Sequence, residues 1–246
     1  MNFHAMTDKG EKREYNEDFV DGFIHENVLF LMAADGQGGG GPGGQSAGKV
    51  AIYEARALIE REYKRGMEKH LEWILNHAFY VAHRACEGVR KGDPGRYGGF
   101  CASMTVVAVM PTREMVFAHI GNTKFLLDRE GNLTQVTTDH TVTQSLLEQR
   151  KITPSEAVNH PERAILTRGI GVFPDAKPDI KRGMLARGDI LLLVSDGITE
   201  HLTLPEIARL VAEAGNIKTA CEYLIRGANE RGGWDNLSAV VSYIDF

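Results

Sequence analysis

The stretch VLFLMAADGQGG, residues 28–39, is the one from which the fold can be built outward. A continuous apolar run that ends in a carboxylate and a glycine is typical of a strand buried on both faces. The end of such a strand is a place where a rigid scaffold can present a charge to a cleft. We therefore predict a buried strand that delivers Asp35 to a site, followed by Gly36, whose backbone carbonyl is not crowded by a side chain.

The same arrangement returns twice further along the chain. Residues 190–200, ILLLVSDGITE, place Asp196 at the end of a second apolar run, and Asp235 lies in GGWDN, directly ahead of the strand-like LSAVVSYI. Three carboxylates brought together would repel one another by about 1 to 4 kcal/mol for each close pair. A cation would offset that repulsion, so we favour a metal site. The alternative is three unrelated structural aspartates.

The composition excludes several classes of function. The 246 residues carry a formal net charge of -5, which gives no general attraction to nucleic acid or to an anionic membrane. No apolar run approaches the length of a bilayer span, and the first residues lack the apolar core of a signal peptide, so we expect a cytoplasmic protein. Cys86, Cys101 and Cys221 show no CxxC spacing, so we expect buried free thiols, and we assign no histidine to a metal.

Groups of strands and helices alternate along the remaining sequence. Residues 49–65 and 67–90 are predicted as helices, the second with apolar residues at helical spacing, and its Trp73 and Tyr80 are interpreted as core residues. Strands are predicted at residues 103–110, 115–120 and 124–128. This grouping indicates one α+β domain over residues 1–246, in which two sheets pack face to face with helices outside.

Capping boxes predict where two of the later helices begin. Thr153 and Thr203 are each followed by a glutamate three residues later and by a proline suited to the first helical turn. The second of these helices should run to about residue 214, and a last helix is predicted over residues 218–231. A shorter helix is predicted over residues 142–149.

One motif points to a different class of enzyme. Residues 43–49, GGQSAGK, match the GxxxxGK pattern of the phosphate-binding loop in nucleotide hydrolases. The context argues against that function, because Val50 stands where a Ser or Thr hydroxyl would bind magnesium and the loop begins several residues after its strand ends. We keep a nucleotide hydrolase as an alternative that Lys49→Ala would test.

The acidic residues indicate which metals the site would hold. Carboxylates, a backbone carbonyl and water suit Mg²⁺ or Mn²⁺ rather than zinc. Two such ions roughly 3.5 to 4 Å apart can activate a water and stabilise an in-line phosphoryl displacement. Arg13 then has a use, because a planar guanidinium matches two phosphate oxygens. The alternative for Arg13 is a surface salt bridge with Glu14 or Glu17.

The motifs DKGEKREYNED, AADGQGG, VSDGITE and GGWDN, in this order and spacing, resemble the metal-dependent serine/threonine phosphatases of the protein phosphatase 2C family. Residues 145–171, SLLEQRKITPSEAVNHPERAILTRGIG, resemble the flap region of the small bacterial members, so a flap is expected at about residues 139–171. The resemblance covers about residues 3 to 244. It implies a four-layer αββα sandwich with a centre of two Mn²⁺ or Mg²⁺ ions in a cleft at one end of the sheets.

The resemblance also implies a role for each carboxylate. Asp35 would bridge both ions, and the carbonyl of Gly36 would bind one of them. Asp196 and Asp235 would hold the other ion. The attacking group would be a hydroxide that bridges the two metals, which would displace the leaving oxygen directly and form no phosphoenzyme.

Three further residues follow from the same resemblance. Glu17 and Asp18 would act through metal-coordinated water or would support Arg13, and Arg13 would bind the substrate phosphate. Arg13, Asp35 and Asp196 are therefore the expected catalytic residues.

The sequence departs from the family pattern at three positions. Gln37 stands where many eukaryotic members have a histidine proposed as the acid, so we expect a metal-coordinated water to take that role. Asn122, in HIGNTK, replaces an aspartate that serves a third metal, which would also use Asp196 and Glu200. An amide binds a hard dication less well than a carboxylate, so we predict a weak or empty third site. Lys124 replaces an arginine, with no predicted effect.

We expect a monomeric bacterial phosphatase that acts on phosphorylated proteins and opposes a eukaryote-like serine/threonine kinase. One alternative is a specialised phosphatase for a single phosphoserine regulator, and another is a non-catalytic binding or regulatory relative, although Asp35, Asp196 and Asp235 are all present. The glycine-rich residues 38–44 are interpreted either as a mobile loop without a role or as a loop that admits phosphopeptides.

Overall fold

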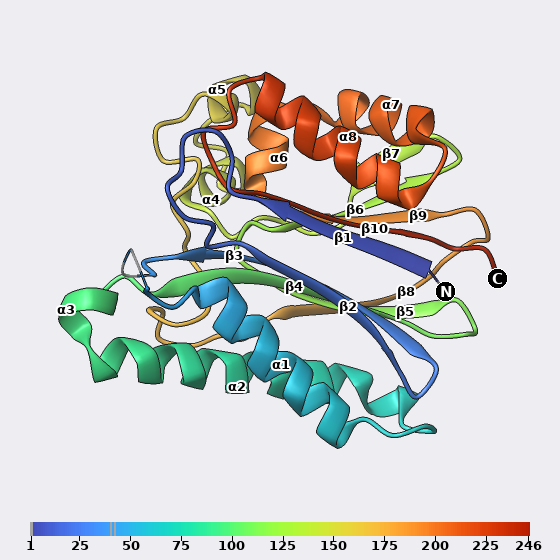
Figure 1. Ribbon diagram of the computed structural model, residues 1–246, viewed down its shortest axis with the longest axis horizontal. Coiled ribbons are helices and arrows are strands. Elements are labelled where there is room, and N and C mark those ends of the chain that lie inside the picture. Colours follow the sequence, from blue (N-terminus) through green and yellow to red (C-terminus); the bar gives the residue numbers. More distant parts are fainter. Residues whose placement is uncertain (1, 40, 42) are drawn as a thin grey trace.

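Within residues 2–39, 41 and 43–246, which the computed structural model describes, the strands form two antiparallel five-stranded sheets that lie between two layers of helices (Figure 1). The strands are β1 Asn2–Asp8, β2 Phe19–His25, β3 Val28–Gln37, β4 Cys101–Val109, β5 Glu114–Ile120, β6 Lys124–Arg129, β7 Asn132–Gln135, β8 Asp179–Met184, β9 Ile190–Val194 and β10 Leu237–Tyr243. The helices are α1 Ala47–Glu62, the short 3-10 turn η1 Glu68–His70, α2 Leu71–Gly92, α3 Pro94–Tyr97, α4 Val142–Glu148, α5 Pro154–Val158, α6 Asp196–His201, α7 Leu204–Ala214 and α8 Ile217–Glu230. The predicted four-layer α+β sandwich is confirmed.

Strand β3 lies inside the first sheet, whose order is β2-β3-β4-β5-β8. Its side chains alternate between two buried faces. Phe30 and Met32 pack among the helix-facing residues, whereas Leu29 and Leu31 pack between the two sheets. Because both faces are buried, residues 28–34 of the strand are apolar at every position rather than at every second one, as predicted.

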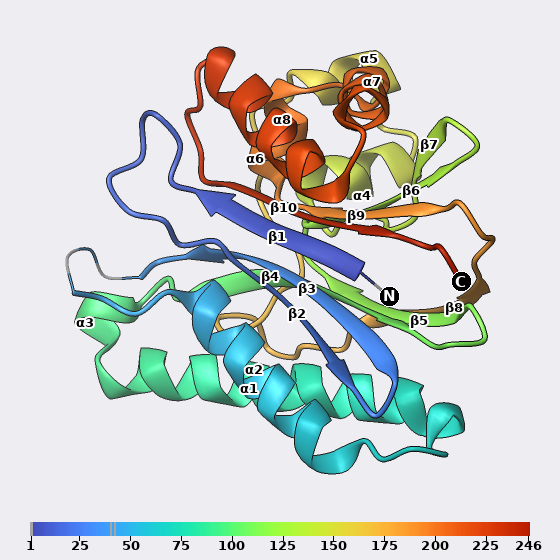
Figure 2. The ribbon, with the colours of Figure 1, turned by 45° about the vertical axis from the view of Figure 1, so that its right-hand side comes forward.

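The second sheet has the order β1-β10-β9-β6-β7 and joins the two ends of the chain. Strand β1 pairs antiparallel with β10, with Phe3 opposite Ser242, and β10 pairs with β9. Figure 2 shows β1 and β10 side by side over the other sheet. This pairing places the loop after β1 beside the loop before β10, although these loops are more than 200 residues apart in sequence.

The outer helices cover one sheet each. Helices α1 and α2 cover the first sheet, and α7 and α8 cover the second (Figure 1). Both predicted capping boxes are present, at Thr153 ahead of α5 and at Thr203 ahead of α7. None of the helices in the described part of the chain combines the length and apolar composition that a bilayer crossing requires.

Two interpretations of aromatic residues on α2 are wrong. Trp73 and Tyr80 are both 57% exposed, rather than in the core. Helix α2 packs on the sheet through its other side, which carries Leu71, Ile74, Leu75, Ala78, Phe79 and Ala82. The tilted rings of Trp73, His77 and Tyr80 therefore follow one another along its outer face.

The chain also contains elements that the sequence pattern does not predict, namely β1, β2, β7, β8, α3 and α6. The segment predicted as a flap contains α4 and α5 and returns to the first sheet through an isolated bridge between Ala102 and Ile170. In the glycine-rich residues 38–44, Gly40 and Pro42 lie outside the described residues. The three cysteines are free and buried, as predicted.

Candidate functional site

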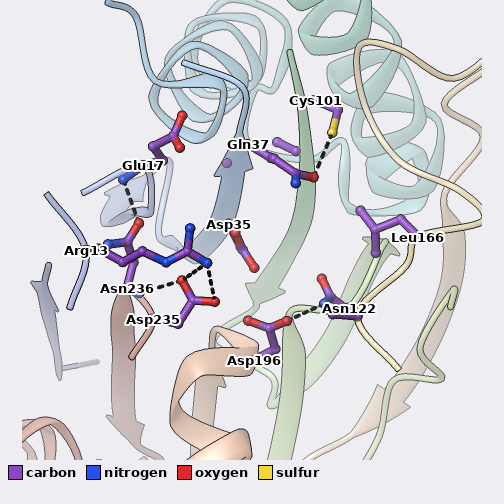
Figure 3. Close-up of a pocket in the computed structure, with 13 residues that line it drawn as sticks. Arg13, Glu17, Asp35, Gln37, Cys101, Asn122, Leu166, Asp196, Asp235 and Asn236 are labelled. Atoms are coloured by element: carbon purple, nitrogen blue, oxygen red, sulfur yellow. Dashed lines mark hydrogen bonds and ion pairs between the residues drawn. The ribbon is translucent and has the colours of Figure 1, made fainter. Parts of the chain in front are cut away.

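Asp35, Asp196 and Asp235 line one pocket of about 120 Å³ (Figure 3). Asp35 lies near the end of β3 in one sheet, whereas Asp196 and Asp235 belong to the end of the other sheet. The full lining consists of Arg13, Glu17, Asp35, Gly36, Gln37, Cys101, Ala102, Asn122, Ala164, Leu166, Asp196, Asp235 and Asn236. Seven of these are residues that the sequence assigned to the site.

The pairing of β9 with β10 brings Asp196 and Asp235 together. Val194 is opposite Ala239, so the residue that begins α6 lies beside the loop that leads into β10. A Cβ atom at Gly197 would lie 2.0 Å from the carbonyl oxygen of Asn236, so only glycine allows this approach. The two carboxylates thus depend on a close backbone contact that follows the Asp-Gly sequence.

Burial and mutual repulsion raise the pKa values of Asp35 and Asp196. Burial raises the pKa of Asp35 well above its usual range, and the charges of Asp196, Asp18 and Asp235 raise it further. Burial raises the pKa of Asp196 to about 6, with Glu200 adding to the shift. Burial and the neighbouring carboxylates thus outweigh the positive charge of Lys124, which acts in the opposite direction on Asp196. The site would therefore gain electrostatic free energy from a bound cation.

Asp18 is buried just ahead of β2 and belongs to the same charge cluster. Burial raises its pKa to about 7, while hydrogen bonds from Ser195 and Ser238 act in the opposite direction. Its Oδ2 atom is buried, and no hydrogen-bond partner for it lies among the described residues. An unpaired buried carboxylate oxygen is a position that water or an ion would fill.

Glu17 and Gly36 lie on the opposite side of the pocket, where the loop before β2 meets the end of β3. The Glu17 carboxylate accepts a hydrogen bond from the backbone of Gly39, and its carbonyl accepts one from Ser46, the N-cap of α1. A Cβ atom at Gly36 would lie 2.5 Å from that carbonyl oxygen. Glycine is therefore required at position 36 for the two segments to pack together.

Arg13 lies at the mouth of the pocket, where its guanidinium pairs with Asp235. One Nη2 to Asp235 distance is 2.9 Å, and Nε donates to the carbonyl of Trp234 over 3.3 Å (Figure 3). Among the described residues, Arg13 thus pairs with Asp235 rather than with Glu14 or Glu17. Its side chain is about half exposed, so it can also meet a ligand that enters from solvent.

The residues predicted for a weak third metal site are engaged with one another or with the flap. The side-chain amide of Asn122 donates to Asp196 Oδ2 over 2.6 Å. Glu200 pairs with Arg163 of the flap segment. The amino group of Lys124 contacts Asp139 Oδ2 at 2.6 Å. Asn122 lines the pocket with Asp196, whereas Glu200 is paired with a residue of the flap.

Asn236 is a site residue that the sequence reasoning missed. Its Nδ2 donates to the carbonyls of Lys9 and Tyr15, each over 2.9 Å, and its Oδ1 accepts from the Glu17 backbone N–H over 2.9 Å. These bonds fasten the Arg13 loop to the Asp235 loop. The feature of the sequence that could have identified Asn236 is its position next to Asp235 in GGWDN. Gln37, Cys101 and Leu166 complete the far wall (Figure 3).

The donor atoms fit divalent Mg²⁺ or Mn²⁺. The acidic cluster offers carboxylate oxygens and the Gly36 carbonyl, which are the hard ligands these ions prefer. Within the described residues, no three His, Cys, Asp or Glu side chains are close enough together to enclose an ion unaided. Water and the backbone carbonyl would therefore have to complete the coordination, as is usual for Mg²⁺.

The residues of the GxxxxGK match are used structurally. The Ser46 hydroxyl caps α1 by accepting from the Lys49 N–H, and the Lys49 amino group lies 5.4 Å from the ring centroid of Tyr53. Lys49, the side chain that this motif would use for phosphate, thus lies over an aromatic ring of α1.

Known proteins resemble this chain in sequence and in fold. The model of the family described as Protein phosphatase 2C matches residues 9–232. The chain is 30% identical to Protein phosphatase PhpP of Streptococcus pneumoniae, over 98% of this chain and 96% of that protein. It superposes with a TM-score of 0.91 on the Streptococcus agalactiae serine/threonine phosphatase, at 26% identity and 99% coverage of both chains. The catalytic domain of serine/threonine protein phosphatase PstP, solved in complex with two manganese ions, has a TM-score of 0.85 at 26% identity, covering 100% of this chain and 98% of that one.

Proposed function

This chain belongs to the protein phosphatase 2C family, and on that premise we propose that it hydrolyses phosphoserine and phosphothreonine in proteins and opposes a serine/threonine kinase. The observation that carries the proposal is the convergence of Asp35, Asp196 and Asp235 from two sheets on one pocket that Arg13 borders. Three carboxylates and a guanidinium combine a place for divalent cations with a group that binds phosphate.

Two Mn²⁺ or Mg²⁺ ions would be held by Asp35, the Gly36 carbonyl, Asp196 and Asp235, with Glu17 and Asp18 acting through water. When bound, they would neutralise charge on the phosphoryl group and make a water more acidic. A neighbour in the comparisons, PstP, was solved with two manganese ions. The raised pKa values of Asp35 and Asp196 support this assignment, because a cation would relieve the repulsion that causes part of each shift.

Arg13 would bind and orient the phosphate. Its guanidinium carries five N–H donors, so it can keep its bond to Asp235 and still donate to a phosphate oxygen. Asp235 holds the guanidinium at the mouth of the pocket, and Asn236 holds the loop that carries it. The phosphate would therefore meet a donor that is already in place, which lowers the entropic cost of orienting it.

Gln37 lies in the pocket wall, where its Oε1 is 3.8 Å from the Cys101 thiol. A side-chain amide does not titrate, so residue 37 cannot supply a proton to the leaving oxygen. We assign that proton to water in the pocket. Asn122 donates to Asp196 and fixes the direction of one carboxylate oxygen.

The test is hydrolysis of a phosphothreonine peptide with Mn²⁺, Mg²⁺ or EDTA. We expect turnover that requires a divalent ion and falls by at least about 100-fold in Asp196→Asn. Asp93→Asn is the matched control, because Asp93 caps α3 outside the pocket and asparagine caps equally well.

Two alternatives make different predictions in the same assay. A non-catalytic relative would show no turnover with any metal. A nucleotide hydrolase would lose activity in Lys49→Ala and keep it in Asp196→Asn. Either result would overturn the proposal.

A further inference from the structure

Trp234 is an exposed aromatic residue beside the pocket for which the mechanism above has no use. Its side chain is 49% exposed, although its backbone carbonyl accepts a hydrogen bond from Arg13 and the next residue is Asp235. Large exposed aromatic side chains at a site are enriched where proteins bind partners.

The indole is fixed against the protein on one side. Its ring centroid lies 4.1 Å from that of His201, and a Cβ atom at Gly232 would lie 2.6 Å from the indole. His201 is buried, and its Nδ1 donates to the Gly197 carbonyl over 2.6 Å. Its Nε2 accepts from the Trp234 backbone N–H over 3.3 Å. These contacts hold the indole in one orientation.

The indole lies within reach of a peptide bound at the pocket. Trp234 directly precedes Asp235, which lines the pocket, and consecutive Cα atoms lie about 3.8 Å apart. An extended peptide advances about 3.3 to 3.6 Å per residue. A side chain two or three residues from a phosphorylated residue in the pocket would therefore come to the position of Trp234.

The surroundings of the indole carry balanced charge. Arg13, which donates to the Trp234 carbonyl, is paired with Asp235. Arg231 is paired with Glu206. Because these charges are offset, the quadrupole of the indole sets which substrate side chain it binds best. The quadrupole favours a cation over the face of the ring. A planar guanidinium stacks better than an ammonium group.

We propose that Trp234 is a specificity-determining residue that stacks on an arginine side chain two or three positions from the phosphorylated residue of the substrate. The inference rests on the phosphatase function proposed above. It specifies a side chain of the substrate peptide near the phosphorylated residue, for which the carboxylate pocket has no preference.

Fluorescence tests the contact directly, because the sequence contains two tryptophans and Trp73 lies on the outer face of α2. In Trp73→Phe, emission reports Trp234 alone. The probes are phosphothreonine peptides with a methylene in place of the bridging oxygen, so that they bind with Mn²⁺ and are not hydrolysed. Each peptide carries arginine, leucine or aspartate two or three residues from the phosphothreonine analogue. Fluorescently labelled copies of the peptides report total binding by anisotropy.

We expect the arginine peptides to change the emission of Trp234 and to bind about 3- to 30-fold more tightly than the leucine peptides, with aspartate weakest. Binding without a change in emission would overturn the contact. Equal or tighter binding of the leucine peptides would overturn the choice of arginine.

Kinetics separate this inference from the proposed function. The ratio of kcat/KM for arginine and leucine phosphopeptides should fall to about 1 in Trp234→Ala and be retained in Trp234→Tyr, which keeps an aromatic face. A purely structural role would lower both values together. Hydrolysis of p-nitrophenyl phosphate by the unmodified protein reports the pocket alone. Turnover of that compound without an arginine preference would contradict only the role of Trp234, whereas no turnover of any substrate would contradict the phosphatase function as well.

Discussion

The side-chain amide of Asn122 donates a hydrogen bond to Asp196 Oδ2 over 2.6 Å. The bond joins the turn between β5 and β6 to the start of α6, and it supplies partial positive charge to a buried carboxylate. A carboxylate at position 122 would instead add a like charge beside Asp196.

We therefore predict that Asn122→Asp lowers the free energy of unfolding in EDTA by about 1 to 4 kcal/mol, and that Mn²⁺ restores more stability to this variant than to the unmodified protein. Urea denaturation with EDTA and across a Mn²⁺ titration measures both effects. Asn132→Asp makes the same change at an exposed position at the start of β7. An Asn122→Asp protein that matched this control at every Mn²⁺ concentration would contradict the prediction.

Removing the guanidinium of Arg13 should weaken the use of phosphopeptides. A hydrogen bond to a charged group contributes about 1.5 to 3 kcal/mol, so kcat/KM should fall about 10- to 150-fold in Arg13→Ala and less in Arg13→Lys. Steady-state kinetics with a phosphothreonine peptide give the value. Arg209→Ala, on the exposed side of α7, serves as the control. A change of less than about twofold in Arg13→Ala would rule out the assigned role.

Asn236 should matter for stability independently of any metal. Asn236→Ala leaves the carbonyls of Lys9 and Tyr15 and the N–H of Glu17 without their present partner. Unpaired buried polar groups cost about 1 to 3 kcal/mol each, and water will reach some of them, so we expect a loss of about 2 to 4 kcal/mol in urea denaturation with EDTA. Asn76→Ala, at an exposed position on α2, is the comparison. A loss no larger than that of the control would show that the loops do not depend on this side chain.

The buried side chain of His119 should make the free energy of unfolding depend on pH. Burial, followed by the charge of His140, lowers the pKa of His119 to about 3 from an ordinary 6.5. Below about pH 6.5 the unfolded chain binds a proton that the folded chain does not accept until about pH 3. The free energy of unfolding should therefore fall as the pH is lowered across this window, by up to about 1.4 kcal/mol per pH unit.

Urea denaturation between pH 4.5 and 7 in EDTA checks this slope. His119→Gln should show a smaller slope than the unmodified protein, because its side chain does not titrate. His70→Gln replaces an exposed histidine and should retain the original slope. Identical slopes in all three proteins would mean that His119 does not contribute to the acid sensitivity.

Local sequence determined the long helices and the buried strands of this protein, and the positions at which those strands deliver charge. The apolar run of β3 predicts a strand buried on both faces because each of its side chains must leave water on one face or the other. The capping boxes predict where α5 and α7 begin because a cap is formed within four residues. The order of the four motifs predicts the family, and the family model confirms it.

Tertiary structure decided which of these residues meet. Arg13 and Asp235 are 222 positions apart and become partners because β1 pairs with β10. Asn236 fastens the same two loops, and the exposure of Trp73 depends on which side of α2 faces the sheet. Short elements such as β7 and α6 are too brief for periodicity to identify. Such contacts depend on strand pairing over long sequence separations, for which a local pattern contains no signal.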